Sequence, residues 1–172
     1  MRNMAFVIVI GILIGTAGFV AKADQTAVAP PQGSTPLLEV RAEGVQVYIC
    51  EGKQDGFEWK YKVPEANLFD KQGQQVGTHT DGPIWKIDDG SQVAGEVVAR
   101  ASAPEPGAIQ WLLLRAKSHQ GSGTLSQAAF IRRADTRGGE PPKTGCDASH
   151  LSQVARMRYS ATYQFFGAAK GE

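Results

Sequence analysis

Apolar and polar residues alternate in several short stretches of the chain. In residues 44–50, Val45, Val47 and Ile49 occupy every second position, and residues 57–62 and 159–165 repeat this period with largely aromatic side chains. Successive side chains of a β-strand point to opposite faces, so a two-residue period predicts strands that bury one face.

Two further stretches, 84–87 and 93–99, are separated by the sequence DDGS at residues 88–91. Asp-Gly tolerates the positive φ that tight turns require, so this segment predicts a hairpin that joins two antiparallel strands. We interpret the two aspartates as turn residues and not as a catalytic carboxylate pair.

Residues 109–116 are apolar on both faces, which predicts a central strand that is covered on both sides, and residues 125–133 predict another strand. Strands at this spacing predict an all-β, mainly antiparallel single domain over residues 37–172, built as a β-sandwich or a β-barrel. One short helix is expected near the C-terminus, because Asp147 can cap residues 148–157.

The first 23 residues have the pattern of a secretory signal peptide. Arg2 precedes an uncharged apolar run over residues 5–20, and the sequence AKA at residues 21–23 predicts cleavage between Ala23 and Asp24. A helix over this run would span only about 24 Å, less than the roughly 30 Å hydrocarbon core, although an uncleaved anchor is the alternative. We therefore expect a secreted or periplasmic protein with no stable membrane anchor after cleavage.

Composition agrees with one globular domain that follows a flexible leader over residues 24–36. The 172 residues are 42% hydrophobic and 20% charged, and they include 20 glycines, which is typical of a fold with many turns. The net charge of +1 would become −1 on removal of Arg2 and Lys22, so charge gives no reason to expect a nucleic-acid partner.

The chain has two cysteines, Cys50 and Cys146. In an oxidising compartment two cysteines pair more often than they stay free, so export predicts a disulfide between them. The alternative is one reactive thiol, which no neighbouring histidine supports.

The motifs that identify common enzymes are absent: there is no GxSxG, P-loop, GxGxxG, HExxH or CxxC pattern. We accordingly expect no cofactor and no metal site.

Two loops carry side chains that could do chemistry. Residues 77–85 place His79, Asp81 and Trp85 within a loop framed by glycine and proline, and His119 lies in a second turn. A histidine beside an aspartate can be an oriented acid or base, two histidines with a carboxylate can bind a metal, and a tryptophan can form an apolar or sugar-stacking wall. The alternative is that both histidines only satisfy backbone groups in turns. His150 is interpreted as a solvated side chain.

A set of short segments spans nearly all of the chain after residue 36 in the order typical of one protein family: residues 44–50, 77–85, 89–95, 109–114, 118–121, 131–133, 136–139, 142, 145–146 and 159–161. In these segments the chain resembles the DUF3455 proteins, a family of exported proteins of unknown function. The resemblance implies export and a mostly β domain and favours the two-cysteine bridge, but it implies no activity. Thr80 stands where the family usually has an aromatic residue, which would alter a site wall at that position.

Three functions remain open at this stage. The first is a non-enzymatic module that binds a small molecule, glycan or envelope component through His79, Trp85 and His119. The second is a hydrolase-like or isomerase-like enzyme that uses His79 with Asp81 and His119, and the third is a structural envelope protein without a ligand. A shared cleft for the two histidine loops would favour the first two. Simple up-and-down strand order argues against such a cleft, because it places the loops at opposite ends of the sheet.

Overall fold

The computed structural model describes residues 25–169 and contains eight β-strands with three short 3-10 turns. The predicted signal peptide and its cleavage site lie outside these residues. In chain order the elements are η1 (Gln25–Val28), β1 (Ser34–Lys53), β2 (Gly56–Phe69), β3 (Gln75–Thr80), β4 (Ile84–Ile87), β5 (Gln92–Ala101), β6 (Trp111–Gln120), η2 (Thr124–Gln127), β7 (Phe130–Gly138), η3 (Ala148–His150) and β8 (Val154–Ala169). In the described part of the chain no helix is long and apolar enough to cross a membrane.

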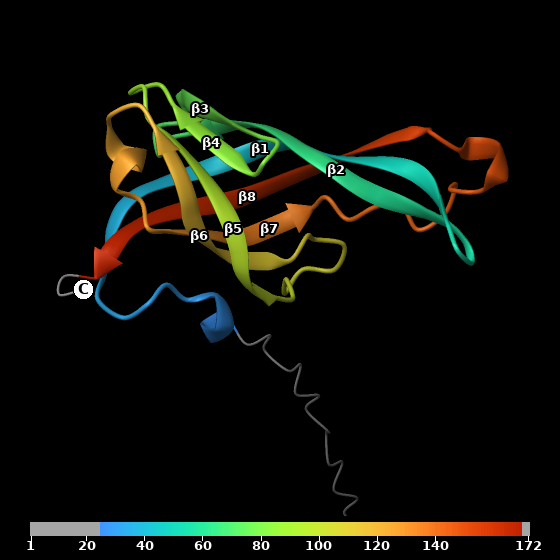
Figure 1. The fold of residues 1–172 in the computed structure, drawn as a ribbon, viewed down its shortest axis with the longest axis horizontal. Helices are drawn as coiled ribbons and strands as arrows, with labels where there is room; N and C mark the ends of the chain where they lie inside the picture. The colour runs from blue at the N-terminus through green and yellow to red at the C-terminus, as the bar shows by residue number, and fades with distance from the viewer. Residues whose placement is uncertain (1–24, 170–172) are drawn as a thin grey trace, which may run out of the picture.

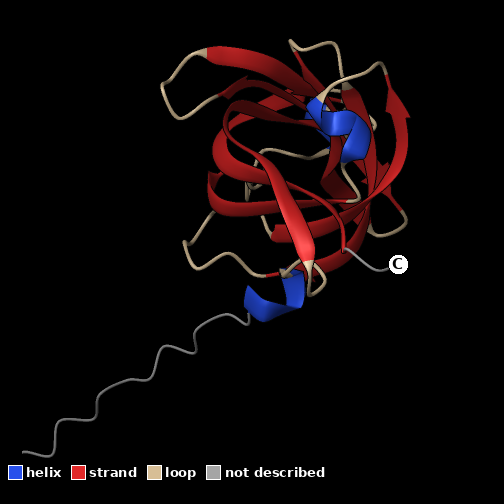
Figure 2. Ribbon diagram, turned by 90° about the vertical axis from the view of Figure 1, so that its left-hand side faces the viewer, coloured by secondary structure: helices blue, strands red, loops and turns tan. Residues whose placement is uncertain are grey.

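The strands form one closed antiparallel barrel (Figure 2). Each strand pairs with the next one in the sequence, and β8 returns to pair with β1 from Ser34↔Ala169 to Ile49↔Val154. The all-β prediction is confirmed, and of the two architectures expected the barrel is the one that forms. Closure removes both sheet edges, which an open sheet would have to protect.

Alternation along the strands sets which side chains fill the barrel. On β8, Tyr159, Ala161, Tyr163 and Phe165 are buried, and the residues between them are half-buried on the other face. The predicted hairpin also forms: β4 and β5 pair through the turn at residues 88–91, where Gly90 has a φ of 89°.

The strand β6 is covered on both sides, as its sequence predicts. Leu112 and Leu114 face the barrel core, whereas Trp111 and Leu113 pack outside it against Val28. The expected flexible leader is therefore not seen over residues 25–36. Val28 is fully buried, because it packs on the apolar outer face of β6. The strand β1 then begins at Ser34.

The helix expected over residues 148–157 is a single 3-10 turn. Asp147 does cap it, since its side chain accepts a hydrogen bond from the Ser149 backbone N–H. The turn ends at His150, Ser152 adopts a positive φ of 68°, and β8 begins at Val154. Pairing of β8 with β1 satisfies the backbone here and replaces the helix.

The two ends of the barrel differ. At one end, which we call the plugged end, η2 inserts Leu125 into the core. There the Asp89 carboxylate accepts hydrogen bonds from Ser91 and from the Thr124 backbone N–H. At the other end the barrel is open. There the β1–β2 hairpin extends together with the chain before β8 (Figure 1).

A disulfide between Cys50 and Cys146, with the two Cα atoms 5.3 Å apart, joins β1 to the segment before β8, as predicted. The same segment is held by the Tyr48 hydroxyl, which donates to the Gly139 carbonyl at 2.7 Å, and by the Trp59 indole, which donates to the Thr144 carbonyl at 3.0 Å. These bonds fix residues 139–146 over the open end of the barrel.

Candidate functional site

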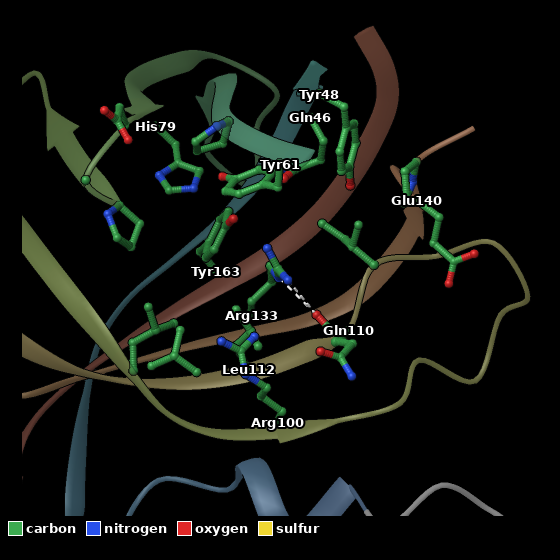
Figure 3. Close-up of a pocket in the computed structure, with 18 of the residues that line it drawn as sticks. Gln46, Tyr48, Tyr61, His79, Arg100, Gln110, Leu112, Arg133, Glu140 and Tyr163 are labelled. Carbon is green, nitrogen blue, oxygen red and sulfur yellow. Dashed lines mark hydrogen bonds between the residues drawn. The ribbon is translucent and has the colours of Figure 1, made fainter. Parts of the chain in front are cut away.

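A cavity of about 810 Å³ lies inside the open end of the barrel (Figure 3). Ligand pockets in proteins are typically about 300–1,000 Å³, so this space can take one small organic molecule. All eight strands contribute to it, together with the β3–β4 turn and two loops. The lining residues are Gln46, Tyr48, Tyr61, Pro64, His79, Asp81, Gly82, Pro83, Trp85, Val97, Arg100, Ile109, Gln110, Leu112, Leu114, Arg133, Glu140, Pro141, Pro142, Lys143 and Tyr163.

Three rings, His79, Trp85 and Tyr163, form the deepest part of the cavity wall, which we call the aromatic floor. His79 and Trp85 face one another across β3 and β4, with stacked rings whose centroids are 4.4 Å apart. Tyr163 on β8 meets both rings edge-on, at 5.0 and 5.2 Å. All three are at most 2% exposed, so the floor is closely packed.

His79 is neutral at physiological pH. Its Nδ1 lies 2.9 Å from the Ile84 carbonyl oxygen, which can only accept, so Nδ1 carries the proton and donates this bond. Burial lowers the pKa of His79 to about 3. The hydrogen bond to the Ile84 carbonyl raises this pKa, but the positive charge of Arg133 lowers it further. The other ring nitrogen, Nε2, is left as an acceptor with no hydrogen bond to the described residues.

Other polar atoms of the cavity wall are also buried without a protein partner. The Gln46 side-chain amide nitrogen and the Trp85 indole nitrogen make no hydrogen bond within residues 25–169, and both side chains are at least 97% buried. Burial also raises the pKa of Tyr163, so its hydroxyl keeps its proton. A buried donor without a partner costs about 1–3 kcal/mol.

Five charged residues surround the mouth of the cavity: Asp81, Arg100, Arg133, Glu140 and Lys143. None of them takes part in an ion pair with another described residue. Arg133 instead donates through Nε and Nη2 to the Gln110 carbonyl, at 3.0 and 2.8 Å (Figure 3).

Comparison with known proteins identifies one family. Residues 30–167 match the family model described as a protein of unknown function, DUF3455. The chain belongs to this family. No curated protein and no solved structure matches it. The DUF3455 match covers the whole barrel, from the residues before β1 to near the end of β8, so the cavity lies within the family domain.

The sequence of this DUF3455 chain predicts four candidate site residues, and three of them line the cavity. His79 and Trp85 lie on the aromatic floor, and Asp81 lies on the exposed β3–β4 turn. No hydrogen bond joins His79 to Asp81. Thr80, the departure from the family pattern, is exposed and does not line the cavity, so it alters no wall of it.

His119 does not line the cavity, so the two histidine loops do not share a cleft, in agreement with the simple up-and-down strand order. Its Nε2 lies 2.7 Å from the Ala128 carbonyl beside η2, at the plugged end of the barrel. The strand order explains the separation, because β6 runs away from the open end. His79 and His119 are also three strands apart, or roughly 14 Å along the curved sheet. His150 bonds the exposed Asp147. Within residues 25–169 no group of three metal-ligating side chains is assembled.

Several cavity residues carry no signal in the sequence. Arg100 faces inward because β5 has a bulge between Val97 and Ala99, which shifts the alternation by one residue. Without that bulge Arg100 would lie on the outer face of the barrel; with it Arg100 lines the mouth of the cavity, where it is exposed. For the pair Arg132 and Arg133, alternation alone indicates that one faces out. The structure shows which one: Arg132 covers the outer Trp111 ring, and Arg133 lines the cavity.

Proposed function

We propose that this protein is a binding module that holds one small organic molecule in the cavity at the open end of the barrel. The observation that most supports the proposal is the cavity itself, about 810 Å³ enclosed by all eight strands, with buried polar atoms that lack protein partners. Eight-stranded barrels are just wide enough to hold one small ligand, and apolar walls with few polar groups are typical of such sites.

The state of His79 favours binding over acid–base catalysis. A general base works best when its pKa is near the operating pH, whereas the pKa of His79 is about 3. His119, the second histidine of the enzymatic alternative, bonds a backbone carbonyl at the other end of the barrel. His79 is better suited to accept a hydrogen bond from a ligand through Nε2.

We also propose that binding takes place outside the cytoplasm. The N-terminal sequence has the pattern of a signal peptide, and the Cys50–Cys146 disulfide needs an oxidising compartment to persist. The disulfide also fixes the segment that contributes Glu140, Pro142 and Lys143 to the cavity.

Titration with phenylnaphthylamine (NPN), a neutral dye that fluoresces in apolar surroundings, tests the binding function. We expect saturable binding of one NPN per chain. Val97→Trp fills the cavity and should weaken binding by at least about tenfold. Val98→Trp is the matched control, because Val97 lines the cavity whereas Val98 is 49% exposed outside it.

Both variants are first checked for a cooperative thermal transition. If Val97→Trp does not fold, Gln110→Trp at the exposed mouth replaces it. Absence of saturable binding, or equal weakening by Val97→Trp and Val98→Trp, would refute a ligand-binding cavity.

A further inference from the structure

Two arginines line the cavity from the same row of the barrel: Arg133 is half-buried, and Arg100 is exposed at the mouth. Arg100 on β5 lies opposite Leu112 on β6, and Leu112 lies opposite Arg133 on β7, so the three side chains share one face. Leu112 belongs to the barrel core, which fixes that face as the inner one. In Figure 3 Arg100 and Arg133 extend toward the same space beside Leu112.

Neither guanidinium has a carboxylate partner in the described chain. Arg133 donates through Nε and Nη2 to the Gln110 carbonyl and lies opposite Tyr163 in the β7–β8 pairing, whereas Arg100 makes no hydrogen bond to a described residue. Elsewhere on the barrel, four exposed arginines each pair with a glutamate: Arg41, Arg115, Arg137 and Arg156. Two guanidinium groups at one cavity without a carboxylate partner are the arrangement that an anion with two oxygens can bridge.

The acidic residues at the mouth do not neutralise the arginines. Asp81 is on the β3–β4 turn and Glu140 follows β7, and neither forms an ion pair with Arg100 or Arg133. Lys143 adds a third positive charge to the lining, so the basic residues outnumber the acidic ones.

The rest of the cavity wall is largely apolar and aromatic. Val97, Ile109, Leu112 and Leu114 line it together with the aromatic floor. Arg133 lies directly opposite Tyr163 in the β7–β8 pairing, so its charge borders the floor, whereas Arg100 is exposed at the mouth. This arrangement matches a molecule with an acid group at one end and an apolar body.

We propose that the ligand is an organic acid bound as its anion, with the acid group between Arg100 and Arg133 and an apolar or aromatic body directed toward His79, Trp85 and Tyr163. This inference rests on the proposed binding function and specifies its ligand class. Planar guanidinium groups match the two oxygens of a carboxylate, and the low-dielectric walls strengthen the attraction.

The test compares two dyes that share one ring scaffold. Anilinonaphthalene sulfonate (ANS) is anionic and NPN is neutral, so the ratio of their dissociation constants isolates the contribution of the acid group. Measurements at about 0.15 M salt screen surface charges beyond about 8 Å. The proteins are the wild type, Arg100→Gln, Arg100→Gln/Arg133→Gln, and Arg115→Gln, an exposed arginine on β6 that does not line the cavity.

We expect the wild type to bind ANS at least about tenfold more tightly than NPN. Arg100→Gln should reduce that preference by about three- to tenfold, the double variant should abolish it, and Arg115→Gln should leave it unchanged. Naphthoate should displace ANS, whereas naphthylmethanol of similar size should not. Since Arg100 makes no hydrogen bond in the described chain, its single variant remains informative even if loss of Arg133 disturbs the loop at Gln110.

Equal affinity of the wild type for the two dyes would overturn the organic-acid ligand and leave the binding function standing. An equal loss of preference in Arg115→Gln and Arg100→Gln would also overturn it, because the effect would then follow net charge and not the cavity. Failure of both dyes to bind would refute the binding function itself.

Discussion

Replacement of His79 by phenylalanine should remove a large part of the dependence of stability on pH. Phenylalanine keeps a ring on Trp85 but carries no ionisable group. In the folded protein the pKa of His79 is about 3, because the ring is buried, whereas the ordinary value for an unfolded chain is 6.5. The unfolded chain therefore binds a proton at His79 that the folded chain excludes.

The sign of the effect follows from this difference. Stability from a neutral His79 is fully present above pH 6.5, declines as the pH falls below that value, and is lost toward pH 3. Over the whole interval the loss is about 4–5 kcal/mol, and between pH 7.5 and pH 4.5 it is about 2–3 kcal/mol. A loss of this size is a large fraction of the stability of an ordinary domain.

Urea unfolding of the wild type and of His79→Phe at pH 7.5 and pH 4.5 measures the effect. The wild type should lose about 2–3 kcal/mol more than the variant over this range. Comparison of the two proteins cancels the contributions of the ionisable groups that they share. Losing the bond to Ile84 lowers the stability of the variant at both pH values and leaves the difference intact. Equal losses in the two proteins would show that His79 is not held neutral by burial.

Three further predictions concern the fold. A Cys50→Ala/Cys146→Ala protein, which no longer closes a loop of about 97 residues, should lose about 4–5 kcal/mol in urea unfolding; a loss below about 1 kcal/mol would contradict this. Asp89→Ala removes a carboxylate that accepts hydrogen bonds from the β4–β5 turn and η2, and should lower the unfolding free energy by about 2–3 kcal/mol, whereas an unchanged midpoint would show the bonds to be dispensable. Gly44→Ala would place a Cβ 2.0 Å from the Glu65 carbonyl oxygen, so we expect a thermal midpoint lower by several degrees, and an unaltered midpoint would mean that β1 and β2 separate easily.

The sequence by itself determined most of the strands and one of their connections, but it missed β3, because residues 77–85 were predicted to be a loop. A two-residue period is a local property, and it identifies both the strand and the residues that share a face, as on β8. The Asp89-Gly90 turn is equally local, because glycine supplies the positive φ that the hairpin requires. The family resemblance and the two cysteines were also readable, and the disulfide they indicated is present.

Closure of the sheet into a barrel is visible only in the tertiary structure, and the cavity exists because the sheet closes. Pairing of β1 with β8 joins residues more than a hundred positions apart, and no local pattern distinguishes a barrel from a sandwich. Closure turns one face of every strand into an interior. There a bulge of one residue carries Arg100 inward, and the strand order leaves His119 at the far end. Side-chain direction depends on register, and register is set by the partner strand, so the residues that line the cavity could not be read from the chain alone.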